Sequence, residues 1–461
     1  MAYTLFPHQT RGAAFLSSSY GTKGLFFGMG TGKTVTALEA AAQVDAKVVG
    51  DMRVLIVAPP IALPMWLNEA QQYLGVYDNV SAILTTGKTP IKRGQRVLVV
   101  SYAIASARAD ELREWLCNSG VVICDESHAL KNPEAKRTKA ILGRDGIAKG
   151  AMYVWLLTGT PITRWNDDMY PFLCRADPAA MEAYLGGTSL QKFQLKYTVR
   201  QKRKFAGARF AKDVVVGNRN TEDLAEWIYT DDNGRGAPLA LRVDLEEVFA
   251  NMPPLTKTSY PIKIDATPEL KAQLKAMEKL SLQDIQEQLK SKEPALASVR
   301  RNLGLAKVKA AAAEIIERIE SGQNVLVGAW HTDVIDALID ALPDKYTADV
   351  IDGRTSSKAK VRVTESWNAG ELNVVVAQIA AAGVSLNLQH GGTQIIVVEE
   401  DWSPSVMDQF YARLWRYGQK KHVHVDTLAS DTKLDKALAR ISRTKELQHE
   451  KFNKVGRDQD E

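Results

Sequence analysis

Two adjoining stretches decide the fold, Lys23-Gly24-Leu25-Phe26-Phe27 and Gly28-Met29-Gly30-Thr31-Gly32-Lys33-Thr34. The first is short and apolar, as a buried strand is, and residues 35–42 after the second are rich in good helix formers. In a glycine loop between a strand and a helix, backbone N–H groups and the positive end of the helix dipole converge on phosphate. The two stretches therefore predict a phosphate-binding loop that opens an α/β domain.

Within this loop, Lys33 is expected to reach the β- and γ-phosphates of ATP, and the Thr34 hydroxyl to bind Mg²⁺. The residues predicted to contact the nucleotide are Gly28, Met29, Gly30, Thr31, Gly32, Lys33 and Thr34. The strict pattern GxxxxGK[ST] is not met, because Phe27 stands where its first glycine should. A glycine turn without a ligand therefore stays open as the alternative.

A pair of adjacent carboxylates, Asp125 and Glu126, strengthens the nucleotide interpretation. They directly follow the apolar run 121–124, which is typical of a buried strand. Ligands of α/β sheets bind at the carboxyl ends of strands. Asp125 is predicted to bind Mg²⁺, and Glu126 to orient or deprotonate the attacking water. The alternative is a pair of solvated surface charges.

Composition places the chain among ordinary soluble proteins. Its 461 residues are 45% hydrophobic and 25% charged, which suggests roughly two to four domains. No apolar run is long enough to span a membrane, and the N-terminus shows no secretory signal. The three cysteines form no CxxC pair, so we expect reduced thiols in a cytoplasmic protein.

The net charge of +5 is too small to indicate a polyanionic partner, but its distribution is uneven. Residues 192–219, here called the basic stretch, contain nine Lys or Arg and one acid. The basic residues are Lys192, Lys196, Arg200, Lys202, Arg203, Lys204, Arg209, Lys212 and Arg219. Aromatic residues are interleaved with them, a combination that favours contact with nucleic-acid phosphate. A solvated basic loop is the alternative.

Strand-like and helix-like segments alternate through the first part of the chain. Apolar runs at 53–58, 96–100, 121–124 and 153–157 each end in a polar or glycine-containing loop. This rhythm predicts a doubly wound parallel sheet. It stops from about 174 to 252, where we predict an insertion that is largely helical with irregular parts. Residues 268–320 are predicted to be helical, with a break at Pro294.

Strand-like runs return at 324–328, 373–376, 394–398 and 422–425, but no second phosphate loop accompanies them. The second domain must therefore contribute something else. Gln409, Arg413 and Arg416 are spaced four and three residues apart and are predicted to share one helical face. That face could present two guanidiniums to the γ-phosphate across a domain cleft. Ordinary surface charge is the alternative.

In order and spacing, these motifs resemble those of the Swi/Snf-type DNA translocases of helicase superfamily two, from about Leu5 to Leu428. The matching segments are 5–9 (adenine-reading Gln9), 28–34 (motif I), 59–69 (Ia), 101–102 (Ib), 125–132 (II), 157–162 (III), 352–353 with Trp367, 382–388 (V) and 401–419 (VI). In this superfamily motif I needs only GxGKT, so Phe27 ceases to count against it. Two departures are Phe27-Gly28 in place of an acidic pair and Ser385 in place of a glycine.

The resemblance implies an α/β protein of two tandem RecA-like parallel-sheet domains with helical insertions. Residues 1–254 would form the ATP-binding lobe with the insertion at about 174–252, residues 255–445 the helicase lobe with the helical region at about 268–320, and 446–461 a tail without assigned function. ATP and Mg²⁺ would be the cofactors. The implied catalytic residues are Lys33, Asp125, Glu126, Gln409, Arg413 and Arg416.

The implied partner is double-stranded or branched DNA, held mainly by its backbone. Residues expected to contact it are Ser101, Tyr102, Thr163, Lys202, Arg203, Lys204, His331 and Ser385. For His331, a packed or capped histidine is the favoured alternative. Residues 216–220 and 241–243 look like the fork-remodelling, annealing-helicase branch, in a compact form found in bacteriophage or bacteria.

The implied activity is DNA-stimulated ATP hydrolysis that drives translocation, in fork remodelling, branch migration or strand annealing. A monomer is expected, in the cytoplasm of the cell or of the host if the chain is phage-encoded, with replication or recombination proteins as partners. The alternatives are a strand-separating or RNA-directed helicase of the same superfamily, an ATP-gated DNA-binding module, and a small-molecule kinase.

Overall fold

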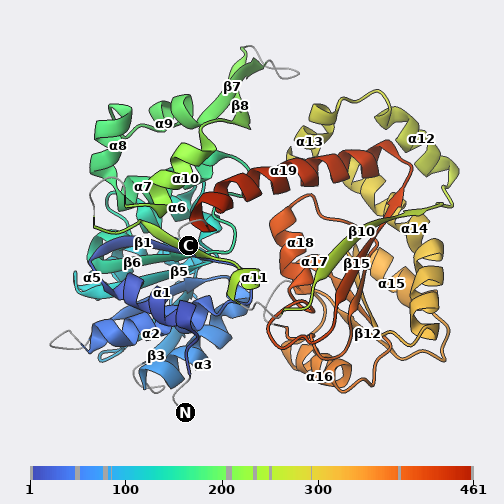
Figure 1. Ribbon diagram of the computed structural model, residues 1–461, viewed down its shortest axis with the longest axis horizontal. Coiled ribbons are helices and arrows are strands. Elements are labelled where there is room, and N and C mark those ends of the chain that lie inside the picture. The colour runs from blue at the N-terminus through green and yellow to red at the C-terminus, as the bar shows by residue number, and fades with distance from the viewer. Residues whose placement is uncertain are drawn as a thin grey trace. The chain divides into compact units, whose positions relative to one another are not determined.

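Figure 1 shows the computed structural model, which describes residues 4–46, 52–75, 81–84, 86–203, 210–231, 236–248, 252–291, 293–382 and 386–457. The chain divides into two compact units. Unit 1 comprises Met1–Val248 and Leu447–Glu461, and unit 2 comprises Phe249–Glu446. The last residues of the chain thus return to the first unit.

The sheet of unit 1 has seven strands in the order β3-β4-β2-β5-β6-β1-β9, and every pair within it is parallel. The strands are β1 (Gly21–Phe27), β2 (Val54–Ala58), β3 (Ser81–Leu84), β4 (Val97–Ser101), β5 (Gly120–Asp125), β6 (Ala151–Leu157) and β9 (Ala240–Val243). The central strands β2 and β4 are buried at every position, as expected where helices cover both faces of a parallel sheet.

The helices of unit 1 lie on both faces of this sheet (Figure 1). They are α1 (Pro7–Ser17), α2 (Lys33–Asp45), α3 (Leu63–Leu74), α4 (Tyr102–Ala107), α5 (Ala109–Leu116), α6 (Lys136–Leu142), α7 (Tyr170–Ala176), α8 (Pro178–Leu185), α9 (Leu190–Tyr197), α10 (Thr221–Tyr229) and α11 (Leu245–Val248). One hydrophobic core lies between the sheet and the helices α4, α5, α6, α7 and α10. On the other face α1 and α2 pack together, and α2 packs on α3.

The insertion contains the helices α8, α9, α10 and α11, and it also contains strands that the sequence analysis did not predict. Its basic stretch contains an antiparallel hairpin of β7 (Thr198–Arg203) and β8 (Lys212–Asn218). The β-branched run 214–216 explains this, because such side chains favour strands. The insertion then ends in β9, which joins the edge of the main sheet beside β1. A strand of unit 1 therefore lies more than 200 residues after β1 in the chain.

The sheet of unit 2 has six strands in the order β10-β15-β14-β11-β13-β12, also all parallel. They are β10 (Leu255–Ile262), β11 (Val325–Ala329), β12 (Ala348–Ile351), β13 (Val374–Gln378), β14 (Gln394–Val397) and β15 (Val423–Ser430). One core contains residues of α16 (Ser357–Asn368) and α18 (Pro404–Tyr411), and a separate core contains α14 (Pro294–Glu320) and α15 (Thr332–Asp340). Two parallel α/β sheets confirm the predicted fold class.

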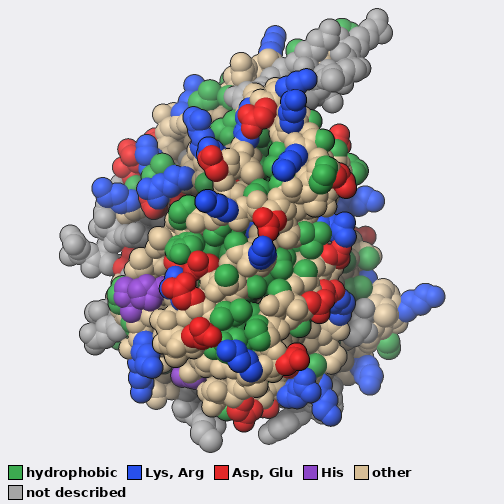
Figure 2. All heavy atoms as spheres, turned by 90° about the vertical axis from the view of Figure 1, so that its right-hand side faces the viewer, with side chains coloured by type: hydrophobic (Ala, Val, Ile, Leu, Met, Phe, Trp, Pro, Cys, Tyr) green, Lys and Arg blue, Asp and Glu red, His purple; other side chains and the backbone are tan. Residues whose placement is uncertain are grey.

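The helical region of unit 2 has the predicted break. It consists of α12 (Pro268–Met277), α13 (Leu282–Ser291) and α14. α14 begins at Pro294, because proline lacks the N–H that a first helical turn leaves unpaired anyway. The face of unit 2 shown in Figure 2 mixes basic and acidic side chains and gathers no single sign of charge. Ion pairs such as Arg301–Asp333 and Arg354–Asp336 belong to this unit.

The chain ends in α19 (Lys433–Arg457). Leu434 and Leu438 at its start pack in the core of unit 2. Phe452, near its end, is fully buried in the core of unit 1, with its ring 5.4 Å from that of Tyr229. The residues assigned to a tail from the sequence therefore supply part of a core. None of the helices described is both long and apolar enough to cross a membrane.

Candidate nucleotide-binding site

The glycine loop lies between the end of β1 and the first residue of α2, as predicted. Gly30 and Gly32 have φ values of 76° and 86°, in the left-handed region that favours glycine. Gly28 N–H donates to Val243 O of β9 at 2.7 Å, and the Thr31 hydroxyl donates to Gly28 O at 2.7 Å. The loop is thus held by one hydrogen bond to β9 and by one within the loop, and it leads into the N-terminus of a 13-residue helix.

The ammonium of Lys33 lies against the base of this loop. Its Nζ donates to Phe27 O at 3.1 Å and to Gly28 O at 3.0 Å. The ammonium of Lys33 and the positive end of the α2 dipole together make the loop a suitable site for an anion.

Helix α1 is hydrogen-bonded to the loop through two side chains. Gln9 accepts from Phe6 N at 3.0 Å and donates to Thr31 O at 3.1 Å, and His8 Nε2 lies 2.8 Å from the same Thr31 oxygen. Burial lowers the pKa of His8. A Cβ added to Gly32 would collide with the Gln9 amide, so the Gln9 side chain would have to shift away from Thr31 O. The predicted contact of Gln9 with adenine stays a prediction, and its amide already contacts the loop.

A hollow of about 310 Å³ lies beside α1. It is lined by Pro7, His8, Arg11, Val243, Glu247 and Val248. The residues from β9 and α11 were not identified from the sequence, because they come from the far end of the insertion.

Asp125 stands at the carboxyl end of β5, where the residue as a whole is half-buried. Its Oδ2 accepts from Trp66 Nε1 at 2.8 Å, and its Oδ1 accepts from Glu126 N at 3.0 Å. Burial and then the neighbouring Glu126 carboxylate raise the pKa of Asp125 to about 6, against the lowering effects of Trp66 and Lys33. Lys33 begins α2 after the loop that follows β1, and β1 and β5 belong to one parallel sheet, so the structure places the two predicted motifs at the same edge of that sheet.

Glu126 has a φ of 49°, an uncommon backbone conformation for a residue other than glycine. Such strain is found at functional sites where the surrounding structure enforces it. The Glu126 carboxylate lies 3.2 Å from His128 Nδ1, which is 3.4 Å from the Thr158 hydroxyl. His128 thus connects the acidic pair to the segment 157–162.

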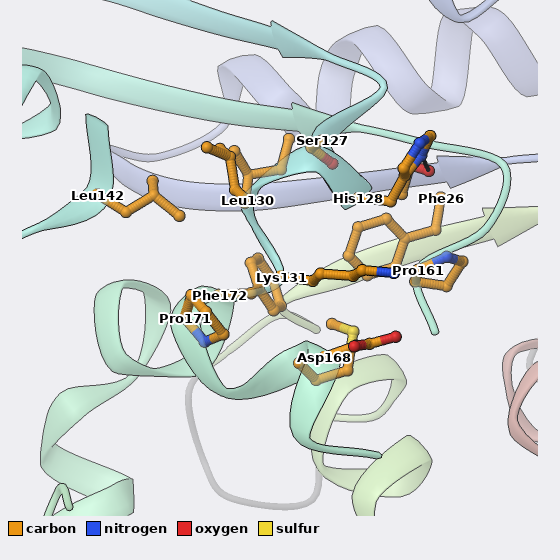
Figure 3. Close-up of a pocket in the computed structure, with 13 residues that line it drawn as sticks. Phe26, Ser127, His128, Leu130, Lys131, Leu142, Pro161, Asp168, Pro171 and Phe172 are labelled. Carbon is orange, nitrogen blue, oxygen red and sulfur yellow. Dashed lines mark hydrogen bonds between the residues drawn. The ribbon is translucent and has the colours of Figure 1, made fainter. Parts of the chain in front are cut away.

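Figure 3 shows a small cavity behind this connection, lined in part by Ser127, His128, Lys131, Pro161 and Asp168. Its volume of about 20 Å³ is enough for roughly one water molecule. Lys131 donates to the hydroxyl of Thr163, which in turn donates to Asp168 at 2.7 Å. The cavity is therefore too small for a substrate.

In unit 2, the helix expected to carry Gln409, Arg413 and Arg416 ends earlier than predicted. α18 stops at Tyr411, so the prediction of one helical face for all three residues is wrong. The reason is tertiary: Leu388 N–H donates to Arg413 O at 3.0 Å and draws the chain into a turn. The two guanidiniums nevertheless converge, because both donate to Leu386 O, at 3.3 and 3.4 Å. Arg413 Nε also donates to Gln409 O at 2.9 Å.

Two family models match the chain. The SNF2-related domain matches residues 8–202, and the helicase conserved C-terminal domain matches residues 306–418. The chain thus contains an SNF2-related domain followed by a helicase conserved C-terminal domain. Each match falls on one of the two parallel-sheet units, so the family assignment and the fold agree.

Several relatives of this SNF2-related chain have curated names. A SWI/SNF-related matrix-associated actin-dependent regulator of chromatin subfamily A-like protein 1 from Xenopus laevis is 25% identical over 94% of this chain and 42% of that protein. The DNA annealing helicase and endonuclease ZRANB3 of Mus musculus is 24% identical over 94% of this chain and 39% of its own length. DNA repair and recombination protein RAD54-like of Danio rerio is 24% identical over 97% of this chain and 67% of its length.

The chain spans 42% and 60% of the lengths of the Xenopus laevis and Caenorhabditis elegans subfamily A-like proteins. Among solved structures, the Sulfolobus solfataricus SWI2/SNF2 ATPase core in complex with double-stranded DNA is 20% identical, with a TM-score of 0.41. That comparison covers 93% of this chain and 88% of the other.

The residues predicted to contact DNA have varied surroundings in this SNF2-related structure. The Ser101 hydroxyl caps α4 by accepting from Ile104 N at 3.2 Å, and the Tyr102 hydroxyl donates to Asp125 O at 2.6 Å. Thr163 is bound to Asp168, and His331 Nδ1 lies 2.7 Å from a Glu399 carboxylate oxygen, which agrees with the packed alternative for this histidine.

Of the basic stretch, Lys202 is exposed on β7. Lys204 and Ser385 lie outside the described residues, as does the side chain of Arg203. The contacts of all these residues with DNA stay predictions.

Proposed function

We propose that this SNF2-related chain is an ATP-dependent DNA translocase that acts on duplex or branched DNA through DNA-stimulated ATP hydrolysis. The observation that carries the proposal is that the glycine loop and the Asp125–Glu126 pair lie at the carboxyl ends of β1 and β5, two strands of one parallel sheet. Relatives named for DNA annealing and for DNA repair and recombination support the choice of DNA as substrate. A cytoplasmic monomer that works beside replication or recombination proteins is part of the same proposal.

Lys33, Thr34 and the first turn of α2 would hold the triphosphate. The Asp125 carboxylate and the Thr34 hydroxyl supply the hard oxygen ligands that Mg²⁺ prefers. No group of three or more His, Cys, Asp or Glu among the described residues is arranged to hold a metal unaided. Mg²⁺ characteristically takes one or two carboxylates and completes its shell with phosphate and water, so the residues fit this ion. When bound, it would neutralise charge on the phosphates.

Glu126 would orient the attacking water and accept its proton, and His128 would hold the Glu126 carboxylate in place. We further propose that Gln409, Arg413 and Arg416 stabilise negative charge on the γ-phosphate during transfer. The convergence of both guanidiniums on Leu386 O supports their acting as a pair.

The hollow beside α1 would receive the nucleobase. Its volume of about 310 Å³ lies at the lower end of the range for ligand pockets. One amide hydrogen of Gln9 would stay bonded to Thr31 O, and the second would contact adenine. Gln9 would thus connect the nucleobase to the glycine loop.

ATP hydrolysis measured with duplex DNA, forked DNA, single-stranded DNA and RNA tests the proposal. We expect duplex or forked DNA to stimulate the wild type, and Lys33→Ala and Glu126→Gln to abolish the stimulated rate. Stimulation by RNA alone would instead assign an RNA-directed helicase. Tight DNA binding with no stimulated hydrolysis in the wild type would assign an ATP-gated binding module.

The salt dependence of binding provides a second, independent test. Contacts that are mainly to the DNA backbone release counterions, so six to ten of them would lower affinity by about 10³–10⁵ between about 50 and 200 mM salt. The measurement is a titration of labelled duplex at several salt concentrations. A shallow slope would contradict a backbone-dominated interface.

A further inference from the structure

One buried cation in unit 1 has no role in the site described so far. Arg242 lies on β9, and its side chain is 4% exposed. Its Nη1 donates to Phe26 O at 2.9 Å and to Gly159 O at 2.9 Å, and its Nη2 donates to the Asp244 carboxylate. A single guanidinium therefore contacts two backbone segments that lie 133 residues apart in sequence (159 − 26).

Both carbonyls lie at functional segments. Phe26 directly precedes Phe27 and Gly28, whose carbonyl oxygens accept from Lys33. Gly159 follows Thr158, whose hydroxyl lies 3.4 Å from His128. Arg242 thus joins the base of the glycine loop to the segment that reaches Glu126 through His128.

The sheet itself does not need this connection. The paired register of β1 and β6 ends at Leu25 and Leu157, and the final bond runs from Thr158 N to Leu25 O at 3.3 Å. Phe26 still belongs to β1, where it pairs with Arg242 of β9, whereas Gly159 lies two residues beyond the end of β6. Arg242 therefore links β1 to the segment after β6 beyond the point where β1 and β6 pair with each other.

Asp244 completes the arrangement from the same segment. Its carboxylate neutralises the buried guanidinium, which would otherwise be costly to desolvate. The same carboxylate lies 3.1 Å from where a Cβ would stand on Gly28, and Val243 O accepts from Gly28 N at 2.7 Å. The end of β9 consequently contacts the glycine loop at more than one point.

We propose that Arg242, held by Asp244, is a positioning residue that couples the glycine loop to segment 157–162, so that DNA binding accelerates ATP hydrolysis. The inference rests on the proposed function. A shift of Gly159 would be transmitted through the shared Nη1 to Phe26 O, and from there to the carbonyls that hold Lys33. Arg242 has no contact with the reacting atoms in this scheme and acts only through the backbone.

The test compares Arg242→Met with Arg242→Lys and with a matched control, Arg108→Met. Arg108 is also a buried arginine of unit 1, with a side chain 6% exposed, paired to Glu111 at 2.7 Å and bonded to Thr89 O at 2.6 Å. The described side-chain hydrogen bonds of Arg108 reach Glu111, Thr86 and Thr89, and none of them reaches the glycine loop. For each variant, kcat and KM for ATP are measured with and without saturating duplex DNA, together with the melting temperature.

We expect Arg242→Met to lower the ratio of DNA-stimulated to unstimulated kcat by about tenfold, with a much smaller change in KM for ATP. Arg242→Lys, which keeps a buried donor for one carbonyl, should recover part of the ratio. Arg108→Met should lose melting temperature but keep the ratio, because a structural role alone does not change coupling.

If Arg242→Met keeps the wild-type ratio of DNA-stimulated to unstimulated kcat, the inference is overturned, whatever the melting temperature of that variant. If that variant does not fold, Arg242→Lys decides, because an unchanged ratio there would equally contradict coupling through the two carbonyls. Failure of the proposed function is distinguishable, since it would appear as a wild type that DNA does not stimulate.

Discussion

At the scale of single residues, the electrostatics of Asp125 are the most informative feature. The carboxylate is buried, receives one indole donor and one backbone donor, and lies beside another carboxylate. Its raised pKa means that ionised Asp125 is destabilising until an opposite charge compensates it. A bound divalent cation would supply that charge, so the same burial that opposes ionisation favours metal binding.

Asp125→Asn should therefore raise the stability of the nucleotide-free protein at pH 7 while abolishing hydrolysis. A carboxyl whose pKa rises from 3.8 to about 6 on folding makes the protein less stable as pH rises through that interval, by about 3 kcal/mol in all. The gain from the substitution should thus be present at pH 7 and largely gone at pH 4. Thermal unfolding at both pH values measures it, and an equal gain at both would contradict the assigned titration.

Trp66→Phe should raise the pKa of Asp125 further, because it removes the indole donor to Oδ2. The acid limb of the pH–rate profile should move upward by about half a unit to one unit. Trp155→Phe is the matched control, since Trp155 is equally buried and its indole N–H has no partner among the described residues. If Trp155→Phe moves the acid limb of the pH–rate profile by the same amount, the effect does not come from the bond between Trp66 and Asp125.

At the scale of elements, the glycine loop depends on the contact of α1 with its backbone. Gly32 combines a φ of 86° with the nearby Gln9 amide, so any side chain there is both strained and obstructed. The element that binds phosphate is thus α2 together with the loop and helix that fix its first turn.

Gly32→Ala should weaken ATP binding by at least about tenfold, because alanine strains the left-handed loop conformation and displaces Gln9 from Thr31 O. Gly75→Ala is the control: Gly75 ends α3 with a φ of 60° and has nothing near its Cβ position. It should cost about 1 kcal/mol of stability and leave nucleotide affinity unchanged. Equilibrium binding of a fluorescent ATP analogue checks both, and normal affinity in Gly32→Ala would show that the loop does not hold the nucleotide.

At the scale of the whole molecule, the chain crosses from one unit to the other twice. The second crossing occurs within α19, after which Phe452 fills a position in the core of unit 1. A fragment that ends at the last residue of β9 would lack this ring, and Tyr229 would lose its neighbour.

Phe452→Ala should destabilise unit 1 by about 3–5 kcal/mol, the usual cost of removing a phenyl ring from a core. Leu447→Ala is on the same helix but 45% exposed, and should change stability by no more than about 0.5 kcal/mol. Chemical denaturation, with unfolding of unit 1 detected by limited proteolysis, measures the stability of each variant. Similar stabilities would show that residues 447–461 are not part of the unit 1 core.

Much of the fold and half of the site were predictable because the information is local. Buried parallel strands appear as continuous apolar runs, and Gly30, Lys33 and Asp125 follow such runs directly. The order of the motifs then identified the family, which the family models confirm. The sequence by itself determined two α/β units, the glycine loop and the acidic pair.

Only the tertiary structure decided which distant residues complete them. Trp66 donates to Asp125, which is 59 residues away in sequence, and Arg242 donates to Phe26, which is 216 residues away. These residues come together because parallel strands far apart in the chain end at the same edge of a sheet. Arg413 and Arg416 left the predicted helix because backbone and side-chain bonds to Leu386 and Leu388 outweigh helical spacing. Periodicity describes a segment by itself, whereas these positions depend on what each segment packs against.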